Sequence, residues 1–73
     1  MDKREWRLQF GILSSHTLPV LLNRLEVELQ YYRSQEDYRD IRVVSIFPDR
    51  DGYTHTAVYE YEAYVVVLGR GGV

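Results

Sequence analysis

The chain has 73 residues and a mass of 8.7 kDa, which is enough for one small domain and leaves no room for a second core. It contains no cysteine, which excludes disulfides and thiolate zinc sites, and its two histidines cannot form a structural metal centre without several carboxylates. Folding buries only about 60% of the surface of so short a chain, and such chains commonly depend on disulfides, metals or partner subunits. The composition therefore predicts a homo-oligomer.

The charge balance excludes some partners. Nine basic residues face eleven acidic ones, for a net charge of −2 and a pI near 5.6. A dedicated nucleic-acid binder shows a basic excess or a basic stripe, and neither is present. Lys3 is the only lysine, so the other basic residues are arginines, whose planar guanidinium pairs with carboxylate and phosphate. With seven tyrosines, which suit surfaces that are buried at one end and wet at the other, this composition is typical of a binding surface.

The sequence also bears on location. The charged amino terminus, Met1–Glu5, is not followed by the hydrophobic core of a signal peptide. The apolar run Tyr64–Leu68 is far too short to span a bilayer. We therefore expect a soluble, cytoplasmic protein with no membrane partner.

The first predicted element is a strand over Glu5–Ser14. Apolar side chains alternate with Arg7, Gln9 and Gly11, which is the period of two of a strand with one buried face; the apolar positions are Trp6, Leu8, Phe10 and Ile12. Ser14, Ser15 and Thr17 then offer hydroxyl groups for a helix N-cap, and Pro19 fits the first helical turn.

A helical pattern follows over Leu18–Arg33. Six apolar residues lie on one face and predict the side toward the core: Leu18, Leu21, Leu22, Leu25, Leu29 and Tyr32. Val20, Val27 and Tyr31 form a second apolar stripe on the opposite side, where a helix on one sheet is ordinarily polar. This stripe predicts contact with another subunit; the alternative is three unrelated surface residues.

The second half of the chain predicts a hairpin. Ser34–Asp40 reads as a connector, and Ile41–Phe47 as a strand with Ile41, Val43, Ser45 and Phe47 on one face. Pro48–Gly52 has the composition of a turn. The last strand runs over Tyr53–Leu68 with apolar or aromatic side chains on both faces, which favours an intermolecular sheet or barrel, and the Gly69–Val73 tail follows.

These elements predict the α+β class: a single β-α-β-β domain over residues 1–73, with flexible ends at 1–4 and 69–73. One helix packs on a three-stranded, mainly antiparallel sheet, and the long last strand lies between the first two.

Short motifs that resemble catalytic or metal sites have structural explanations. Ser14-Ser15-His16 is better explained by helix capping, and Asp49-x-Asp51 by a hairpin turn, than by a nucleophile or a calcium loop. Glu60 and Glu62 share a strand face roughly 6.6 Å apart and are expected to form ion pairs with Arg7 and Arg42 on neighbouring strands. We predict no enzymatic activity, no metal and no cofactor.

The element order and two segments resemble the dodecins, small flavin-storing proteins that assemble into shells. Glu60–Val67 is similar to their last strand, and Leu22–Leu29 lies where their helix does. Dodecins carry a flavin-stacking tryptophan just after the helix, where this sequence has Asp40-Ile41-Arg42, so flavin binding does not transfer. The chain is also similar in size and style to small phage-encoded proteins that sequester nucleotide signals.

The sequence thus favours a non-enzymatic oligomeric module that binds or sequesters a small anionic, nucleotide-like ligand. Arginines would meet phosphate, aromatic rings would stack on a base, and polar side chains would read its edges; the candidate residues are Trp6, Arg7, Gln9, Arg42, His55, Tyr61, Tyr64 and Arg70. The alternative is a protein-interaction module, such as an inhibitor or a regulatory subunit, that acts through its tyrosines and its long strand edge.

Overall fold

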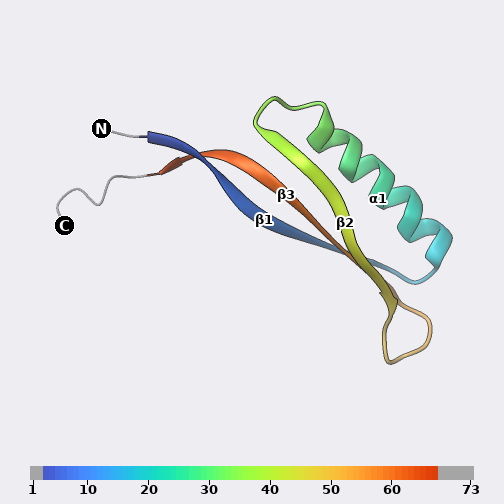
Figure 1. Ribbon diagram of the computed structural model, residues 1–73. Helices are drawn as coiled ribbons and strands as arrows, with labels where there is room; N and C mark the ends of the chain where they lie inside the picture. Colours follow the sequence, from blue (N-terminus) through green and yellow to red (C-terminus); the bar gives the residue numbers. More distant parts are fainter. Residues whose placement is uncertain (1–2, 68–73) are drawn as a thin grey trace.

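The computed structural model describes residues 3–67 and contains β1 (Lys3–Ser15), α1 (Leu18–Arg33), β2 (Tyr38–Pro48) and β3 (His55–Val67) (Figure 1). The predicted α+β class, the element order and the bounds of the helix are confirmed. Lys3 and Arg4, expected in a flexible end, are the first residues of β1. The predicted ends at 1–2 and 69–73 lie outside the described residues.

The sheet has the order β1-β3-β2, and both neighbouring pairs are antiparallel. β1 pairs with β3 over its whole length, from Lys3 opposite Val67 to Ser15 opposite His55. β2 pairs with β3 only from Tyr38, which lies opposite Ala63. β1 and β3 therefore continue beyond β2 as a two-stranded ribbon, as Figure 1 shows, and the chain measures 50 × 27 × 14 Å.

The helix begins and ends where local chemistry favours it. Thr17 is the N-cap, and its side-chain oxygen accepts a hydrogen bond from the Val20 amide at 3.3 Å. Pro19 occupies the first turn, where no backbone donor is needed. The Arg24 guanidinium donates to the Ser14 carbonyl at 2.7 Å and so ties the helix to the end of β1.

The core lies between α1 and the sheet and is small. Leu21, Leu25 and Leu29 are buried, at a spacing of four, against Ala57 and Tyr59 of β3. The core-facing stripe of the helix is narrower than predicted, because Leu18 and Leu22 flank this contact and stay exposed. The second stripe of Val20, Val27 and Tyr31 is exposed.

Gly11 decides which side of β1 faces the helix. A Cβ atom at this position would lie 2.1 Å from Cζ of Tyr59, so the Tyr59 ring occupies the space above the glycine. Tyr59 belongs to the core beneath α1, and the odd-numbered side of β1 therefore faces the helix. The interpretation of the apolar side of β1 as its buried face is wrong, since Leu8, Phe10 and Ile12 are exposed on the other side.

Two irregularities in β2 change its predicted faces. The register against β3 shifts between Arg39 and Arg42 and again between Val43 and Ser45. Ile41 and Val43 remain on the helix side, where Ile41 packs against the core. Ser45 lies opposite Val58, and Phe47 opposite Thr56, on the other side of the sheet; the list Ile41, Val43, Ser45 and Phe47 therefore does not form one face. Bulges insert residues that a simple alternation does not count.

The connection between β2 and β3 spans residues 49–54 and contains most of the predicted turn, although Pro48 ends β2. The last strand, predicted over Tyr53–Leu68, begins at His55, and Leu68 lies outside the described residues. One Asp51 carboxylate oxygen accepts hydrogen bonds from the Tyr53 and Thr54 amides, both at 2.8 Å, and the other accepts from the Thr54 hydroxyl. These bonds, the Thr54 hydroxyl first, lower the pKa of Asp51 to about 2. Gly52 has a φ of 77°, in the region that glycine adopts most readily. The aspartates here shape a hairpin.

The contact between Gly11 and Tyr59 gives a prediction about stability. Gly11→Ala places a methyl group inside the Tyr59 ring and should lower the free energy of unfolding by about 1–3 kcal/mol, the usual cost of overpacking. In a Tyr59→Leu background the same substitution should cost less, because the ring is gone. Urea unfolding followed by circular dichroism measures both. Gln9→Ala, at an exposed position on the same strand and side as Gly11, is the control. Equal effects of Gly11→Ala in the two backgrounds would contradict the packing argument.

Candidate functional site

The side of the sheet away from α1, here called the open face, is the candidate site. Within residues 3–67 no other element lies over it (Figure 1). Paired positions of an antiparallel sheet share a face, so the register assigns its members: Trp6, Leu8, Phe10 and Ile12 of β1; Val58, Glu60, Glu62, Tyr64 and Val66 of β3; and Arg39, Arg42, Ser45 and Phe47 of β2.

An apolar row follows β1 on the open face. Leu8, Phe10 and Ile12 are 54%, 61% and 68% exposed, at consecutive same-face positions about 6.6 Å apart. Near the hairpin, Val58 lies directly opposite Ile12, and Phe47 adds another exposed ring on β2. Isolated exposed apolar side chains are ordinary, whereas a contiguous row is typical of an interaction surface.

Two ion pairs cross the open face between β2 and β3. Arg42 Nε lies 3.2 Å from Glu60 Oε1, and Arg39 Nε donates to Glu62 Oε1 at 2.7 Å. Arginines three positions apart reach the same face because Asp40, with a φ of 54°, lies between them where the register shifts. Aspartate tolerates this left-handed conformation better than most residues. The bulge thus matches both arginines to both glutamates.

The predicted ion pairs are confirmed for Arg42 and wrong for Arg7. Arg7 lies opposite Ala63 on the helix side of the sheet, and it pairs with Glu5 of its own strand at 3.0 Å. Arg39, and not Arg7, pairs with Glu62. Sequence reasoning missed Arg39 because it assigned residues 34–40 to a connector, whereas the strand begins at Tyr38.

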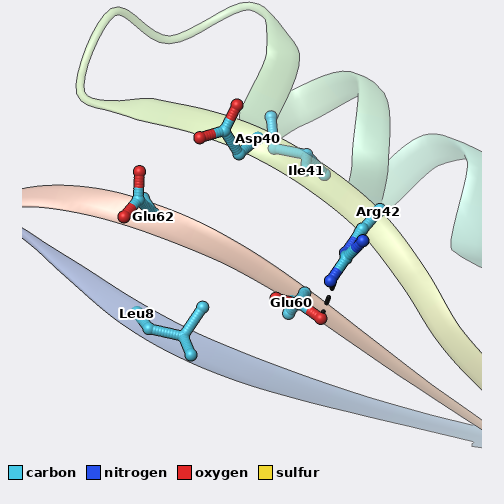
Figure 2. Close-up of a pocket in the computed structure, with 6 residues that line it drawn as sticks. All are labelled: Leu8, Asp40, Ile41, Arg42, Glu60 and Glu62. Carbon is cyan, nitrogen blue, oxygen red and sulfur yellow. Dashed lines mark ion pairs between the residues drawn. The ribbon is translucent and has the colours of Figure 1, made fainter.

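A hollow of about 450 Å³ opens where these side chains meet. Figure 2 shows Leu8 reaching toward it from β1 and Arg42 paired with Glu60 at its side. One guanidinium and three carboxylates contribute charge to the wall, and the residues that line it are Leu8, Asp40, Ile41, Arg42, Glu60 and Glu62. Because carboxylates outnumber the guanidinium, which is itself paired, the hollow does not favour an anion.

At the other end of the open face, aromatic rings and guanidinium groups meet; this cluster of Arg4, Trp6, Arg39 and Tyr64 is called the aromatic end. The Trp6 and Tyr64 rings have centroids 5.0 Å apart. Arg39 lies over the Trp6 ring at 3.9 Å, and Arg4 lies over the Tyr64 ring at 5.8 Å. Arg39 also donates to Glu62, and this hydrogen bond lowers the pKa of that carboxyl.

Five tyrosines cluster on the opposite, helix-facing side: Tyr31, Tyr32, Tyr38, Tyr59 and Tyr61. Tyr32 and Tyr61 stack with centroids 4.3 Å apart. The hydrogen bond with Tyr32, and then burial, raise the pKa of Tyr61 to about 12. The Tyr59 hydroxyl donates to Glu28 of the helix at 3.1 Å. Tyr61 therefore belongs to the packing between α1 and the sheet.

The structure does not bring the eight predicted ligand residues into one site. Trp6 and Tyr64 are in contact, and Arg42 shares their face. Three others lie on the helix side, because the odd-numbered residues of β1 and β3 face the helix: Arg7, Gln9 and Tyr61. His55 starts β3 near the hairpin, at the far end of the sheet, with its ring beside the Tyr53 carbonyl. Arg70 lies outside the described residues.

Other kinds of site find little support. Across residues 3–67, no three histidine, aspartate or glutamate side chains gather closely enough to hold a metal ion. The single helix of this part of the chain lacks the length and apolar character needed to cross a membrane.

Comparison with known proteins identifies no relative. No protein-family model matches the chain, and no curated protein or solved structure matches it. The observed β-α-β-β topology is compatible with the resemblance to dodecins, and membership of that family stays a prediction.

The double role of Arg39 gives a second prediction. Arg39→Met removes the hydrogen bond that lowers the pKa of Glu62, so this pKa should rise toward its ordinary value of 4.5. A carboxyl with a lowered pKa stabilises the fold above its ordinary pKa, and this contribution is lost as the pH falls through the lowered value. NMR titration of the glutamate carboxyl carbons measures the change. Arg42→Met, which removes the partner of Glu60 instead, should leave the Glu62 titration in place; a shift of the same size in both variants would contradict the assigned pairs.

Proposed function

We propose that the protein is a non-enzymatic protein-interaction module whose working surface is the open face. The observation that supports this best is the exposed row of Leu8, Phe10 and Ile12 on the sheet side away from the helix. At about 25 cal/mol per Å² of apolar surface removed from water, covering such a row supplies a large part of the free energy of association.

The polar part of the open face fits the same function. Arg39 and Arg42 are each paired with a glutamate, so they add balanced charge beside the apolar row. Interfaces between proteins combine an apolar centre with polar surroundings that fix orientation. A phosphate-binding site, in contrast, needs guanidinium groups that are available to the ligand.

Site-specific photo-crosslinking in cells that produce the protein tests this proposal. A photo-reactive p-benzoylphenylalanine in place of Phe10 should give an adduct of discrete protein mass after irradiation, because Phe10 lies in the middle of the row. The same group in place of Tyr53 is the control, since this turn residue is 75% exposed and lies outside the open face. No adduct at Phe10, or equal adducts at both positions, would contradict the proposal.

We propose a second candidate function on the strength of the aromatic end: binding of a small anionic, nucleotide-like ligand. Trp6 and Tyr64 offer ring faces for a base, and Arg4 and Arg39 place two guanidinium groups beside them. Binding on the covered face of Trp6 requires Arg39 to leave both the ring and its hydrogen bond with Glu62 and to move toward the phosphate. Of the predicted ligand residues, this candidate keeps Trp6 and Tyr64.

Fluorescence of Trp6, the only tryptophan, tests the second candidate directly. Titration with a panel of nucleotides and cyclic dinucleotides should quench this fluorescence in a saturable way. Arg4→Gln should weaken binding about 10- to 100-fold, which corresponds to the loss of one hydrogen bond to a charged group. Arg33→Gln, in the last turn of the helix, should leave binding unchanged. Absence of saturable quenching up to millimolar ligand would contradict this candidate.

A further inference from the structure

We infer that the partner which covers the open face is a second copy of this chain, packed sheet against sheet in a two-fold symmetric dimer. The inference rests on the proposed interaction function and specifies its partner. It concerns the row of Leu8, Phe10 and Ile12 together with the two charged pairs beside it.

The chain exposes more surface than a compact monomer of its mass, which supports a second layer over the open face. A compact monomer of 8.7 kDa is expected to expose about 4,700 Å², whereas this chain exposes 5607 Å². This surface leaves room for a contact of standard size, in which each partner buries roughly 800 Å². The radius of gyration, 15.7 Å, likewise exceeds the roughly 11 Å of a compact domain of 73 residues.

The charges of the open face favour a copy of itself. The pairs Arg39–Glu62 and Arg42–Glu60 contain two cations and two anions. Arg4 of the aromatic end and Asp40 of the hollow add one charge of each sign, so the surface carries no excess charge that calls for an acidic or a basic partner. The net charge of the whole chain is only −2, so two copies repel each other weakly. In a two-fold dimer the same patch meets itself, and a charge-balanced patch is compatible with that symmetry.

The sheet geometry specifies the contact. Two sheets that pack face to face keep their strands within about 30° of each other at a separation of about 10 Å, with the inner side chains interdigitated. Phe10 is the middle residue of the row, so in this dimer the two-fold axis lies between the sheets, perpendicular to the strands and near Phe10, and the two Phe10 rings lie close together. Leu8 of one copy then faces the Ile12 region of the other.

Sedimentation of the purified chain tests the dimer. The wild-type protein should sediment as a dimer or a multiple of it, in a concentration-dependent equilibrium. Phe10→Glu should weaken the dimer at least about 100-fold, because it buries two carboxylates without partners near the axis. Phe10 is 61% exposed within its own chain, so helical circular dichroism should be retained. A wild-type monomer at every concentration would overturn the inference.

Cysteine crosslinking tests whether the open face or the second stripe of the helix forms the dimer contact. It tests the dimer even if Phe10→Glu does not fold. The chain has no cysteine, so each introduced thiol is unique. Phe10→Cys should give a covalent dimer readily with a short bismaleimide, because Cα atoms on sheets about 10 Å apart are too distant for a direct disulfide. Val27→Cys is the matched control, since Val27 is 64% exposed on the second stripe of the helix. Faster crosslinking at Val27, or equal rates at the two positions, would overturn the open-face dimer.

These experiments distinguish failure of the second-copy inference from failure of the proposed interaction function. If the purified chain is a monomer but crosslinks in cells at Phe10 to a different protein, the interaction function stands and the second copy is wrong. If Phe10 gives no adduct in cells and the purified chain is a monomer, both are wrong. An adduct of twice 8.7 kDa, together with a dimer in sedimentation, supports both.

Discussion

The close approach of the Tyr59 ring to Gly11 determines how the rest of the molecule is arranged. Only a residue without a Cβ atom leaves room for that ring, so the odd-numbered side of β1 must face the helix. Because side chains alternate along a strand, the same contact turns Leu8, Phe10 and Ile12 to the opposite side. One packing contact therefore both completes the core and creates the apolar row of the open face.

The bulge at Asp40 has a comparable effect on the charged part of that face. Without the register shift, Arg39 and Arg42 would point to opposite sides of the sheet, and one guanidinium would lie on the helix side. With it, both arginines meet glutamates on β3, and Arg39 extends over the Trp6 ring. A single residue in the left-handed conformation thus joins the hollow and the aromatic end into one continuous surface.

Much of the fold is predictable from the sequence because its signals are local. Thr17, Pro19 and the leucine spacing identify the helix, and the alternation along the last strand correctly places Glu60 and Glu62 on one face. Local sequence patterns do not show which side of β1 meets the helix. That choice depends on the contact of Gly11 with Tyr59, which lies some fifty positions away in the sequence. The pairing of Arg39 with Glu62 is likewise not predictable from local sequence patterns. Hydrophobic patterns do not reveal a bulge, and the face that each β2 residue occupies depends on the two register shifts against β3.

The relative lengths of the elements explain why α1 leaves part of the sheet uncovered. At 1.5 Å per residue the 16-residue helix is about 24 Å long, whereas 13 strand residues extend over about 43 Å. The helix can therefore cover little more than half the length of one face. The buried core beneath it consists chiefly of three leucines of α1 together with Ala57 and Tyr59 of β3. Domains are stable when apolar faces are buried between layers. In this chain one layer is supplied by α1, and the proposed partner would supply a second layer over the exposed apolar row of β1.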